Sequence, residues 1–278
     1  MKPFYKRDGV TIYCGDNAEV LTEWDAGSID LTVTSPPYDN LRRYNGYLWD
    51  FPAVAGQLWR VTAKGGVVVW VVGDATVNGS ETGTSFRQAL HFMGLGFNLY
   101  QTMHYHKDGP PPQDDKYEKV TEYMFVFSHN KPKAINLLKD KKNNWAGTSN
   151  WGQKTIREAD GRLTTRKPIT VGEYGKRTTI WRYSSGGIDL GHPAPFPEAL
   201  ARDHIISWSN EGDLVCDPFL GSGTTAKMAQ QLGRRFVGCD VSEEYCRIAV
   251  DRLRQPSFFS LPSQPETVAK PEQATMEL

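Results

Sequence analysis

Residues 213–229 read DLVCDPFLGSGTTAKMA, an apolar run that passes through a glycine turn into a helix-compatible stretch. The run Leu214–Cys216 predicts a short buried strand, and the residues after Gly223 predict a helix. Gly221 and Gly223 permit a sharp turn and a close approach of the backbone to a ligand, while the helix N-terminus adds partial positive charge. A strand, a glycine turn and a helix in this order indicate a cofactor site in an α/β fold.

A second strand-like segment, RRFVGCD at residues 234–240, ends in an acidic residue. In a doubly wound sheet, an acid at the end of the neighbouring strand usually binds ribose hydroxyl groups, which suggests this role for Asp240; a helix N-terminal acid is the alternative. The full dinucleotide fingerprint is absent, because Ala226 follows the turn where a third glycine is expected. We therefore expect a nucleoside cofactor without a pyrophosphate, near Asp217 and Phe219, which flank the turn.

Short runs rich in β-branched residues alternate with helix-compatible stretches along most of the 278-residue chain. Further strands are predicted at Ile29–Thr34, Val67–Val72 and Tyr123–Ser128. The second of these is apolar throughout, as expected of a strand buried on both faces. Helices are predicted within residues 81–96 and 242–256. The alternation predicts an α/β, Rossmann-like fold with a mostly parallel twisted sheet.

The composition, with 39% hydrophobic and 23% charged residues, is typical of a water-soluble globular protein. The chain has no apolar run of about 18 residues and no signal sequence, so we expect a cytoplasmic protein that binds no membrane. Its four cysteines form no C-x-x-C pair, so neither a metal site nor a disulfide is expected. The formal net charge is zero, so any affinity for nucleic acid must come from the distribution of charge.

The section at residues 129–187 concentrates positive charge in this neutral chain, with 13 lysines and arginines against four acidic residues. Such a segment is a candidate for binding nucleic-acid phosphates, although a solvated surface loop has the same composition. Its tryptophans are expected either to stack on bases or to pack a small subdomain; they are Trp145, Trp151 and Trp181. The following tail, residues 256–278, is rich in proline and polar residues and is predicted to be disordered.

The segment TSPPY, residues 34–38, ends a predicted strand in a stiff corner. Two adjacent prolines exclude a helix and a central strand, because each fixes φ and lacks the backbone N–H donor. An ordinary turn places Gly, Asn or Asp at its corner, whereas this corner is rigid and leads into an aromatic ring. We infer that it presents Ser35 and Tyr38 in a defined geometry at the C-terminal end of a strand.

Together these segments resemble the motifs of the S-adenosylmethionine-dependent DNA amino-methyltransferases, which methylate exocyclic amines. DPFLGSGTT resembles motif I of this family and TSPPY its catalytic motif IV, and the catalytic motif comes first, which is the β-group order. Four more segments are similar to family motifs: HPAPFPEALARDHI to motif X, RRFVGCD to motif II, YCGDNAEVL to motif III and VTEYMFVFSHN to motif VIII. The resemblance covers about residues 8–255.

The resemblance implies S-adenosyl-L-methionine as the cofactor and divides the chain into parts. These are a catalytic half at residues 1–128, an inserted target-recognition region at 129–187, a cofactor-binding half at 188–255 and the tail at 256–278. The implied catalytic residues are Ser35, Pro36, Pro37 and Tyr38. The implied cofactor-binding residues are Asp16, His192, Phe196, Asp217, Phe219, Gly221, Gly223, Thr224 and Asp240.

An exocyclic base amine is a poor nucleophile, because its lone pair is delocalised into the ring. Two acceptors, here the Ser35 hydroxyl and the Pro36 carbonyl, can take its hydrogens, draw the nitrogen toward tetrahedral geometry and aim the lone pair at a methyl group. Tyr38 offers a face on which the base stacks after it is flipped out of the duplex. Family members that methylate adenine N6 usually carry Asp or Asn at the first position, so Ser35 favours cytosine N4, with adenine N6 as the alternative.

The implied partner is double-stranded DNA, in a bacterial or phage modification role in which a cognate restriction endonuclease is a candidate partner. A monomer and a homodimer are both compatible with the sequence. Two other function classes stay open, namely a methyltransferase acting on RNA or on a protein amide, and a DNA-binding regulator with a vestigial site. C5-cytosine methylation is disfavoured, because no Pro-Cys dipeptide supplies a thiolate nucleophile.

Overall fold

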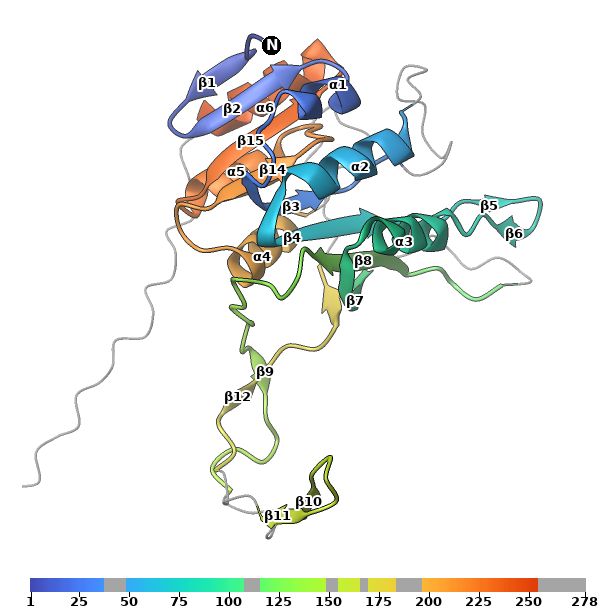
Figure 1. The fold of residues 1–278 in the computed structure, drawn as a ribbon, viewed down its shortest axis with the longest axis vertical. Coiled ribbons are helices and arrows are strands. Elements are labelled where there is room, and N and C mark those ends of the chain that lie inside the picture. Colours follow the sequence, from blue (N-terminus) through green and yellow to red (C-terminus); the bar gives the residue numbers. More distant parts are fainter. Residues whose placement is uncertain (38–48, 108–115, 149–154, 166–169, 184–196, 255–278) are drawn as a thin grey trace, which may run out of the picture.

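The computed structural model describes residues 1–37, 49–107, 116–148, 155–165, 170–183 and 197–254. Its central element is a nine-stranded sheet with the order β1-β2-β15-β14-β3-β4-β8-β7-β13 (Figure 1). The strands are β1 (Tyr5–Arg7), β2 (Val10–Cys14), β3 (Ile29–Thr34), β4 (Thr62–Val72), β7 (Asn98–His106), β8 (Thr121–Ser128), β13 (Ile180–Arg182), β14 (Leu214–Asp217) and β15 (Arg235–Asp240). Five adjacent strands from β2 to β4 run parallel, and β8 runs antiparallel to both of its neighbours.

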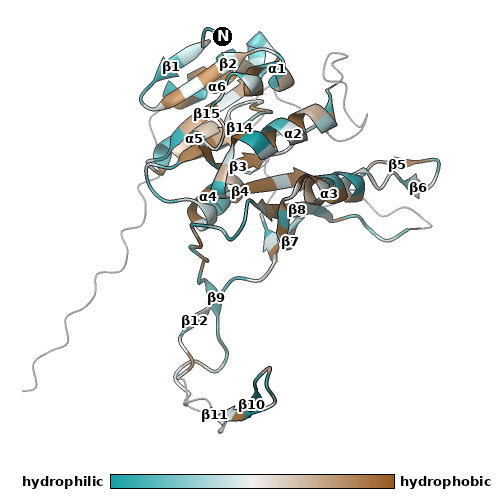
Figure 2. Cartoon of the chain, viewed as in Figure 1, coloured by the Kyte–Doolittle hydropathy of each residue, from teal (hydrophilic) through white to brown (hydrophobic). Residues whose placement is uncertain are grey.

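Two layers of helices cover the sheet. One face carries α1 (Asn17–Thr22), α2 (Phe51–Val61) and α3 (Thr84–Leu95), and the other carries α4 (Glu198–Trp208), α5 (Thr224–Gln231) and α6 (Glu243–Arg254). Side chains of β4 alternate between the two cores, because Val69 and Val71 pack with the second group of helices and Trp70 and Val72 with the first. From Val67 to Val72 the strand is apolar and buried on both faces, as its brown colour in Figure 2 shows. None of the described helices is long and apolar enough to span a membrane.

The predicted α/β, Rossmann-like architecture is confirmed, and the predicted elements differ from the observed ones mainly at their ends. β3 has the predicted bounds, whereas β4 begins at Thr62 instead of Val67. The helix predicted within residues 81–96 begins only at Thr84, because a small hairpin of β5 (Thr76–Val77) and β6 (Ser80–Glu81) precedes it. It ends as predicted at a glycine, since Gly96 adopts a left-handed φ of 113°.

The chain between β8 and α4 leaves the sheet. Two small antiparallel ladders form there, β9 (Lys141–Lys142) with β12 (Tyr174–Gly175) and β10 (Thr155–Arg157) with β11 (Leu163–Thr165). We call residues 139–179 the arm; Figure 1 shows its described parts, from β9 to β12, projecting away from the sheet, and the chain then returns as β13 beside β7. The tail predicted to be disordered lies outside the described residues.

The substitution Leu58→Ala tests the assigned core, because Leu58 of α2 is fully buried. Loss of its side chain leaves a cavity and is expected to lower the free energy of unfolding by about 2–5 kcal/mol. The matched control is Leu90→Ala on α3, where the side chain is 66% exposed and the expected change is below about 0.5 kcal/mol. Urea unfolding of both variants measures the difference, and equal destabilisation would contradict the assignment.

Candidate active site

The C-terminal ends of five parallel strands lie at one edge of the sheet, the edge at which such sheets usually bind ligands. β14 ends at Asp217 and β15 at Asp240, and β2 is followed closely by Asp16. β3 ends at Thr34, so Ser35 is the first residue beyond it. This edge therefore brings the start of the predicted catalytic corner next to the predicted cofactor turn.

The glycine turn after β14 is held by backbone hydrogen bonds. The Leu220 N–H donates to the Cys239 carbonyl and the Gly223 N–H donates to the Leu220 carbonyl, each at 2.9 Å. Gly221 and Gly223 have φ values of 50° and 79°, in the region that favours glycine. A Cβ on Gly223 would lie only 2.7 Å from the Cβ of Ala249, so α6 packs directly on the turn. Both backbone conformation and close packing thus require glycine here.

The Asp240 carboxylate joins the glycine turn to the loop after β15. Its Oδ2 accepts a hydrogen bond from the Gly221 N–H and its Oδ1 accepts one from the Ser242 N–H, each at 2.9 Å. Burial raises the pKa of this carboxyl group, and the backbone donors oppose that shift. A carboxylate oxygen can accept more than one hydrogen bond, so this arrangement is compatible with the predicted binding of ribose hydroxyl groups.

The Asp217 carboxylate connects the two predicted motifs. It is buried, and its Oδ1 accepts hydrogen bonds from the Thr34 hydroxyl at 2.6 Å and from the Phe219 N–H at 3.0 Å. On the other side of the turn, the Thr225 hydroxyl donates to the Val33 carbonyl at 3.2 Å. Burial raises the pKa of Asp217 to about 6. The end of β3 is therefore bonded to both sides of the glycine turn.

The described part of the predicted catalytic corner consists of Ser35, Pro36 and Pro37. Pro36 is buried, and the two residues beside it are half-buried. The corner follows directly on Thr34, as predicted, so its first residue is adjacent in the chain to the hydrogen bond with Asp217. Its position relative to the turn is thus set by the sheet itself.

Of five other predicted residues, the structure describes two. Asp16 caps α1, because its Oδ1 accepts hydrogen bonds from the backbone N–H groups of residues 18 and 19 at 2.8 and 3.2 Å. Thr224 is buried at the first position of α5, behind the glycine turn. The positions of Tyr38, His192 and Phe196 lie outside the described residues, so their predicted roles stay predictions.

Aromatic rings flank the turn on the side of β4. The Phe219 ring meets Trp49 edge-on at a centroid distance of 4.8 Å and lies 6.1 Å from Trp70. Trp49 in turn meets Phe51 edge-on at 5.8 Å. Our sequence reasoning missed Trp49 and Phe51, for which the only local signal is the aromatic density of the segment LWDF. These rings give the site an apolar side next to its polar strand ends.

A buried arginine, also missed from the sequence, holds the back of the turn. Arg252 of α6 donates to the Ser222 carbonyl and hydroxyl, both at 2.8 Å, and to the Thr224 hydroxyl at 3.1 Å. It also pairs at 2.6 Å with Glu198 of α4, which pairs with Lys227 of α5 at 2.8 Å. Burial acts to raise the pKa of Glu198, but hydrogen bonds from the two cations hold it below its usual value. Three helices are thus locked around the turn.

Comparison with known proteins finds clear relatives along the sequence. Residues 29–251 match the family model described as DNA methylase (N6_N4_Mtase). The chain is 54% identical over 236 residues to the orphan methyltransferase M.BamHII of Bacillus amyloliquefaciens, covering 82% of this chain and 89% of that protein. It is 27% identical over 268 residues to the type II methyltransferase M.ScaI of Streptomyces caespitosus, covering 91% of this chain and 84% of that protein.

Solved structures share the fold. The PvuII DNA methyltransferase, described as cytosine-N4-specific, gives a TM-score of 0.68 at 21% identity, covering 93% of this chain and 91% of that chain. A putative DNA modification methylase of Thermus thermophilus in complex with S-adenosyl-L-methionine gives a TM-score of 0.60 at 26% identity, covering 87% of this chain and 92% of that chain. The expected Rossmann-like fold and the expected cofactor, S-adenosyl-L-methionine, are thereby confirmed.

The substitution Asp217→Asn is expected to change how stability depends on pH. The folded-state pKa of about 6 lies above the usual 3.8, so the contribution of this group to stability is fully present below about pH 4 and is lost as pH rises toward 6, where the buried group ionises. Asn keeps an acceptor oxygen for Thr34 and the Phe219 N–H but carries no charge, so relative to wild type it should gain about 3 kcal/mol between about pH 4 and pH 7.

Urea unfolding of both proteins without cofactor measures this gap. The control is Asp251→Asn, at a side chain that is 72% exposed, where the change in the free energy of unfolding should stay below about 0.5 kcal/mol. A constant gap for Asp217→Asn would show that the carboxyl group does not titrate as its burial implies.

Proposed function

Because the chain belongs to the DNA methylase family of N6- and N4-methyltransferases, we propose that it methylates the N4 amine of cytosine in duplex DNA. The observation that carries the proposal is the hydrogen bond from Thr34 to Asp217, which holds the Ser35 corner beside the glycine turn. The target cytosine is flipped out of the duplex, because its amine cannot reach such a corner from within the base stack.

The residues at the strand ends fit S-adenosyl-L-methionine. The glycine turn presents backbone without side chains, and the carboxylate of Asp240 suits a ribose, whose hydroxyl groups donate hydrogen bonds. The rings of Phe219 and Trp49 offer apolar contact to an adenine. When bound, the cofactor supplies an electrophilic methyl group on a sulfonium centre.

The Ser35 corner prepares the amine for attack. The Ser35 hydroxyl oxygen and the Pro36 carbonyl each accept one amine hydrogen, which draws the nitrogen toward tetrahedral geometry. Attack of the nitrogen lone pair on the methyl carbon would form the N–C bond and break the C–S bond, with the electron pair left on sulfur and the released amine proton passing to solvent. The proline ring fixes φ and Pro36 is buried, so the two acceptors are preorganised before the base arrives.

Serine at the first position of the corner supports cytosine as the target base. A hydroxyl oxygen is a neutral acceptor, weaker than the carboxylate of Asp or the amide of Asn. In the resemblance described above, serine at this position accompanies N4-cytosine methylation, whereas Asp or Asn accompanies N6-adenine methylation. The basic arm supports DNA as the substrate, since its described lysines and arginines at positions 139, 141, 142, 157 and 162 are exposed.

Analysis of the product tests the proposal directly. Duplex DNA incubated with the purified protein and S-adenosyl-L-methionine, then digested to nucleosides, is expected to contain N4-methylcytosine by mass spectrometry. N6-methyladenine in its place would reassign the base within the family. Cofactor binding without any methylated base would contradict the proposed enzymatic activity and favour a DNA-binding regulator.

Two substitutions are expected to distinguish the catalytic role of the Ser35 corner from the cofactor-binding role of the glycine turn. Ser35→Ala removes one amine acceptor and should lower kcat by about 10²–10³-fold with little change in the dissociation constant of S-adenosyl-L-methionine. Asp240→Ala removes the carboxylate proposed to bind the ribose and should raise that dissociation constant at least about tenfold. Calorimetry and single-turnover methylation measure the two effects. A reversed pattern would refute both role assignments.

A further inference from the structure

The arm has no hydrophobic core in its described part. Between residues 139 and 179, none of the described side chains is buried, and the two ladders contain two and three residue pairs. Figure 2 shows the contrast between this largely hydrophilic segment and the sheet. The direction in which the described arm leaves the protein therefore depends on its attachment and not on packing within it.

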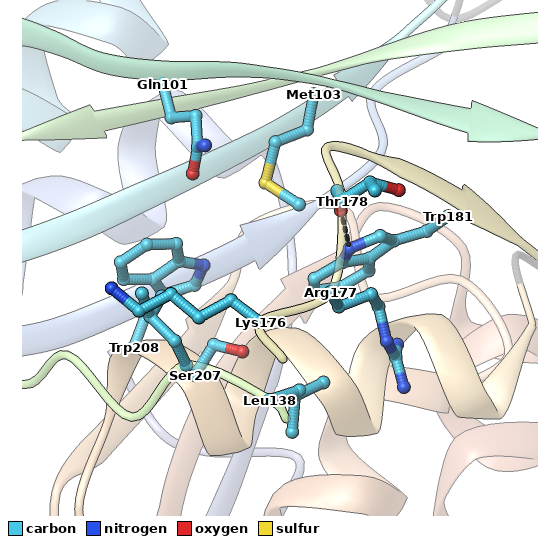
Figure 3. Close-up of a pocket in the computed structure, with 10 residues that line it drawn as sticks. Gln101, Met103, Leu138, Lys176, Arg177, Thr178, Trp181, Ser207 and Trp208 are labelled. Carbon is cyan, nitrogen blue, oxygen red and sulfur yellow. Dashed lines mark hydrogen bonds between the residues drawn. The ribbon is translucent and has the colours of Figure 1, made fainter. Parts of the chain in front are cut away.

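Packing at the attachment is also incomplete. A cavity of about 130 Å³ lies between the residues that directly precede the arm, the last residues of the arm and the sheet. Gln101 and Met103 of β7 border it on one side and Trp208 of α4 on another (Figure 3). Leu138, which directly precedes the arm, and Thr178 of the arm also line it. Side chains on opposite sides of the cavity make fewer van der Waals contacts than they would in a filled core. Apolar packing at this place therefore restricts the arm only weakly.

Hydrogen bonds of Arg177 connect the two ends of the arm with helix α4, where apolar packing is incomplete. Its backbone N–H donates to the Leu138 carbonyl at 2.9 Å, and its Nε donates to Asp140 at 2.8 Å, so it ties the last residues of the arm to the first. Its Nη1 donates to the Asp203 carboxylate of α4 at 2.6 Å and to the Tyr183 hydroxyl at 3.0 Å. One arginine thus connects both ends of the arm to helix α4.

The surroundings make this set of contacts hard to replace. Asp203 is buried, and it also accepts hydrogen bonds from the Tyr183 hydroxyl at 2.8 Å and from Arg202. The Arg177 guanidinium lies 5.1 Å from the centroid of the Trp181 ring, which is itself buried against the sheet (Figure 3). Burial opposes the charge of Arg177, yet the two carboxylates hold its pKa above the usual value. The planar fork of arginine matches several partners at once, which an ammonium group cannot do.

Helix α4 connects the attachment of the arm with the glycine turn. Asp203 lies on the same helix as Glu198, whose carboxylate pairs with Arg252, and Arg252 donates to the Ser222 carbonyl and hydroxyl. A helix is stiff over such a distance, so the arm is positioned relative to the turn through one rigid element.

We propose that Arg177 is a positioning residue, which sets the direction of the arm relative to the cofactor turn and so determines how DNA is placed over the Ser35 corner. The part concerning DNA rests on the proposed function, whereas the orientation of the arm does not. Arg177 itself is not proposed to touch DNA, because each of its three guanidinium nitrogens already donates to Asp140, Asp203 or Tyr183.

Distance measurement between spin labels tests the orientation without any substrate. One label is placed in the arm by Ala159→Cys and one on α6 by Glu244→Cys, in a Cys14→Ser background that removes the partly exposed native thiol. Arg177→Gln is expected to broaden a narrow distance distribution, and Arg177→Lys to broaden it less. Arg162→Gln, which breaks only a local pair with Asp160, is the matched control and should leave the distribution unchanged. An unchanged distribution in Arg177→Gln would overturn the proposal.

Kinetics of the full-length protein provide the second readout. Arg177→Gln is expected to raise the KM for duplex DNA about tenfold, with the cofactor dissociation constant and kcat at saturating DNA nearly unchanged. A broadened distribution with an unchanged KM would keep the positioning role and refute the role of the arm in DNA recognition. A raised KM with an unchanged distribution would indicate direct contact with DNA and overturn the proposal. If Arg177→Gln does not fold, Asp140→Asn and Arg177→Lys decide by the same criteria.

Discussion

The hydrogen bond from the Thr34 hydroxyl to the buried Asp217 carboxylate is the contact on which the site depends, at 2.6 Å across 183 residues of chain. It joins the ends of two neighbouring parallel strands, whose register pairs Val215 with Leu31. The same carboxylate oxygen also accepts the Phe219 N–H at the entry to the glycine turn. One buried acceptor therefore sets the corner and the turn together, and losing either donor would leave part of its hydrogen-bonding capacity unmet in a dry environment.

The proposed chemistry makes that constraint necessary. In the proposed reaction the methyl group passes directly from sulfur to nitrogen, so the contribution of the protein is orientation of two reactants and two acceptors. Errors of a fraction of an ångström matter in such a mechanism. The hydrogen bond between Thr34 and Asp217 restricts their relative position, because the sheet fixes the backbone at both of its ends.

Charge holds the outer parts of the molecule in a similar way. Helix α4 carries one ionic network at Glu198, directed to the glycine turn, and another at Asp203, directed to the arm. Arg252 and Arg177 each donate to several acceptors. A shift of the glycine turn or of the arm would therefore leave a buried charge without its partner. Although the net charge is zero, the charged residues fall into two groups. Paired charges in the interior hold segments in place, and the basic residues of the arm are exposed to solvent.

Local physics explains which predictions from the sequence succeeded. The strand ending at Thr34, the strand at β4 and the glycine turn follow from apolar runs, from proline and from the freedom of glycine at positive φ, all of which act within a few residues. The ends of elements were less accurate, as at Thr62, because pairing with a neighbouring strand extends β4 beyond its apolar run. The sequence did not reveal that Arg252 and Arg177 form buried or partly buried ion pairs, because an arginine in a helix or in a basic segment resembles an ordinary surface residue.

The sequence by itself determined the kinds of elements, their order, the stiffness of the Pro-Pro corner and the bare backbone of the glycine turn, because each of these is a property of short stretches of chain. Only the tertiary structure decided that Thr34 meets Asp217, that Trp49 lies against Phe219 and that Arg177 joins the arm to α4. Those meetings depend on strand order and on which charges are buried together, and both are settled by the packing of segments far apart in the chain.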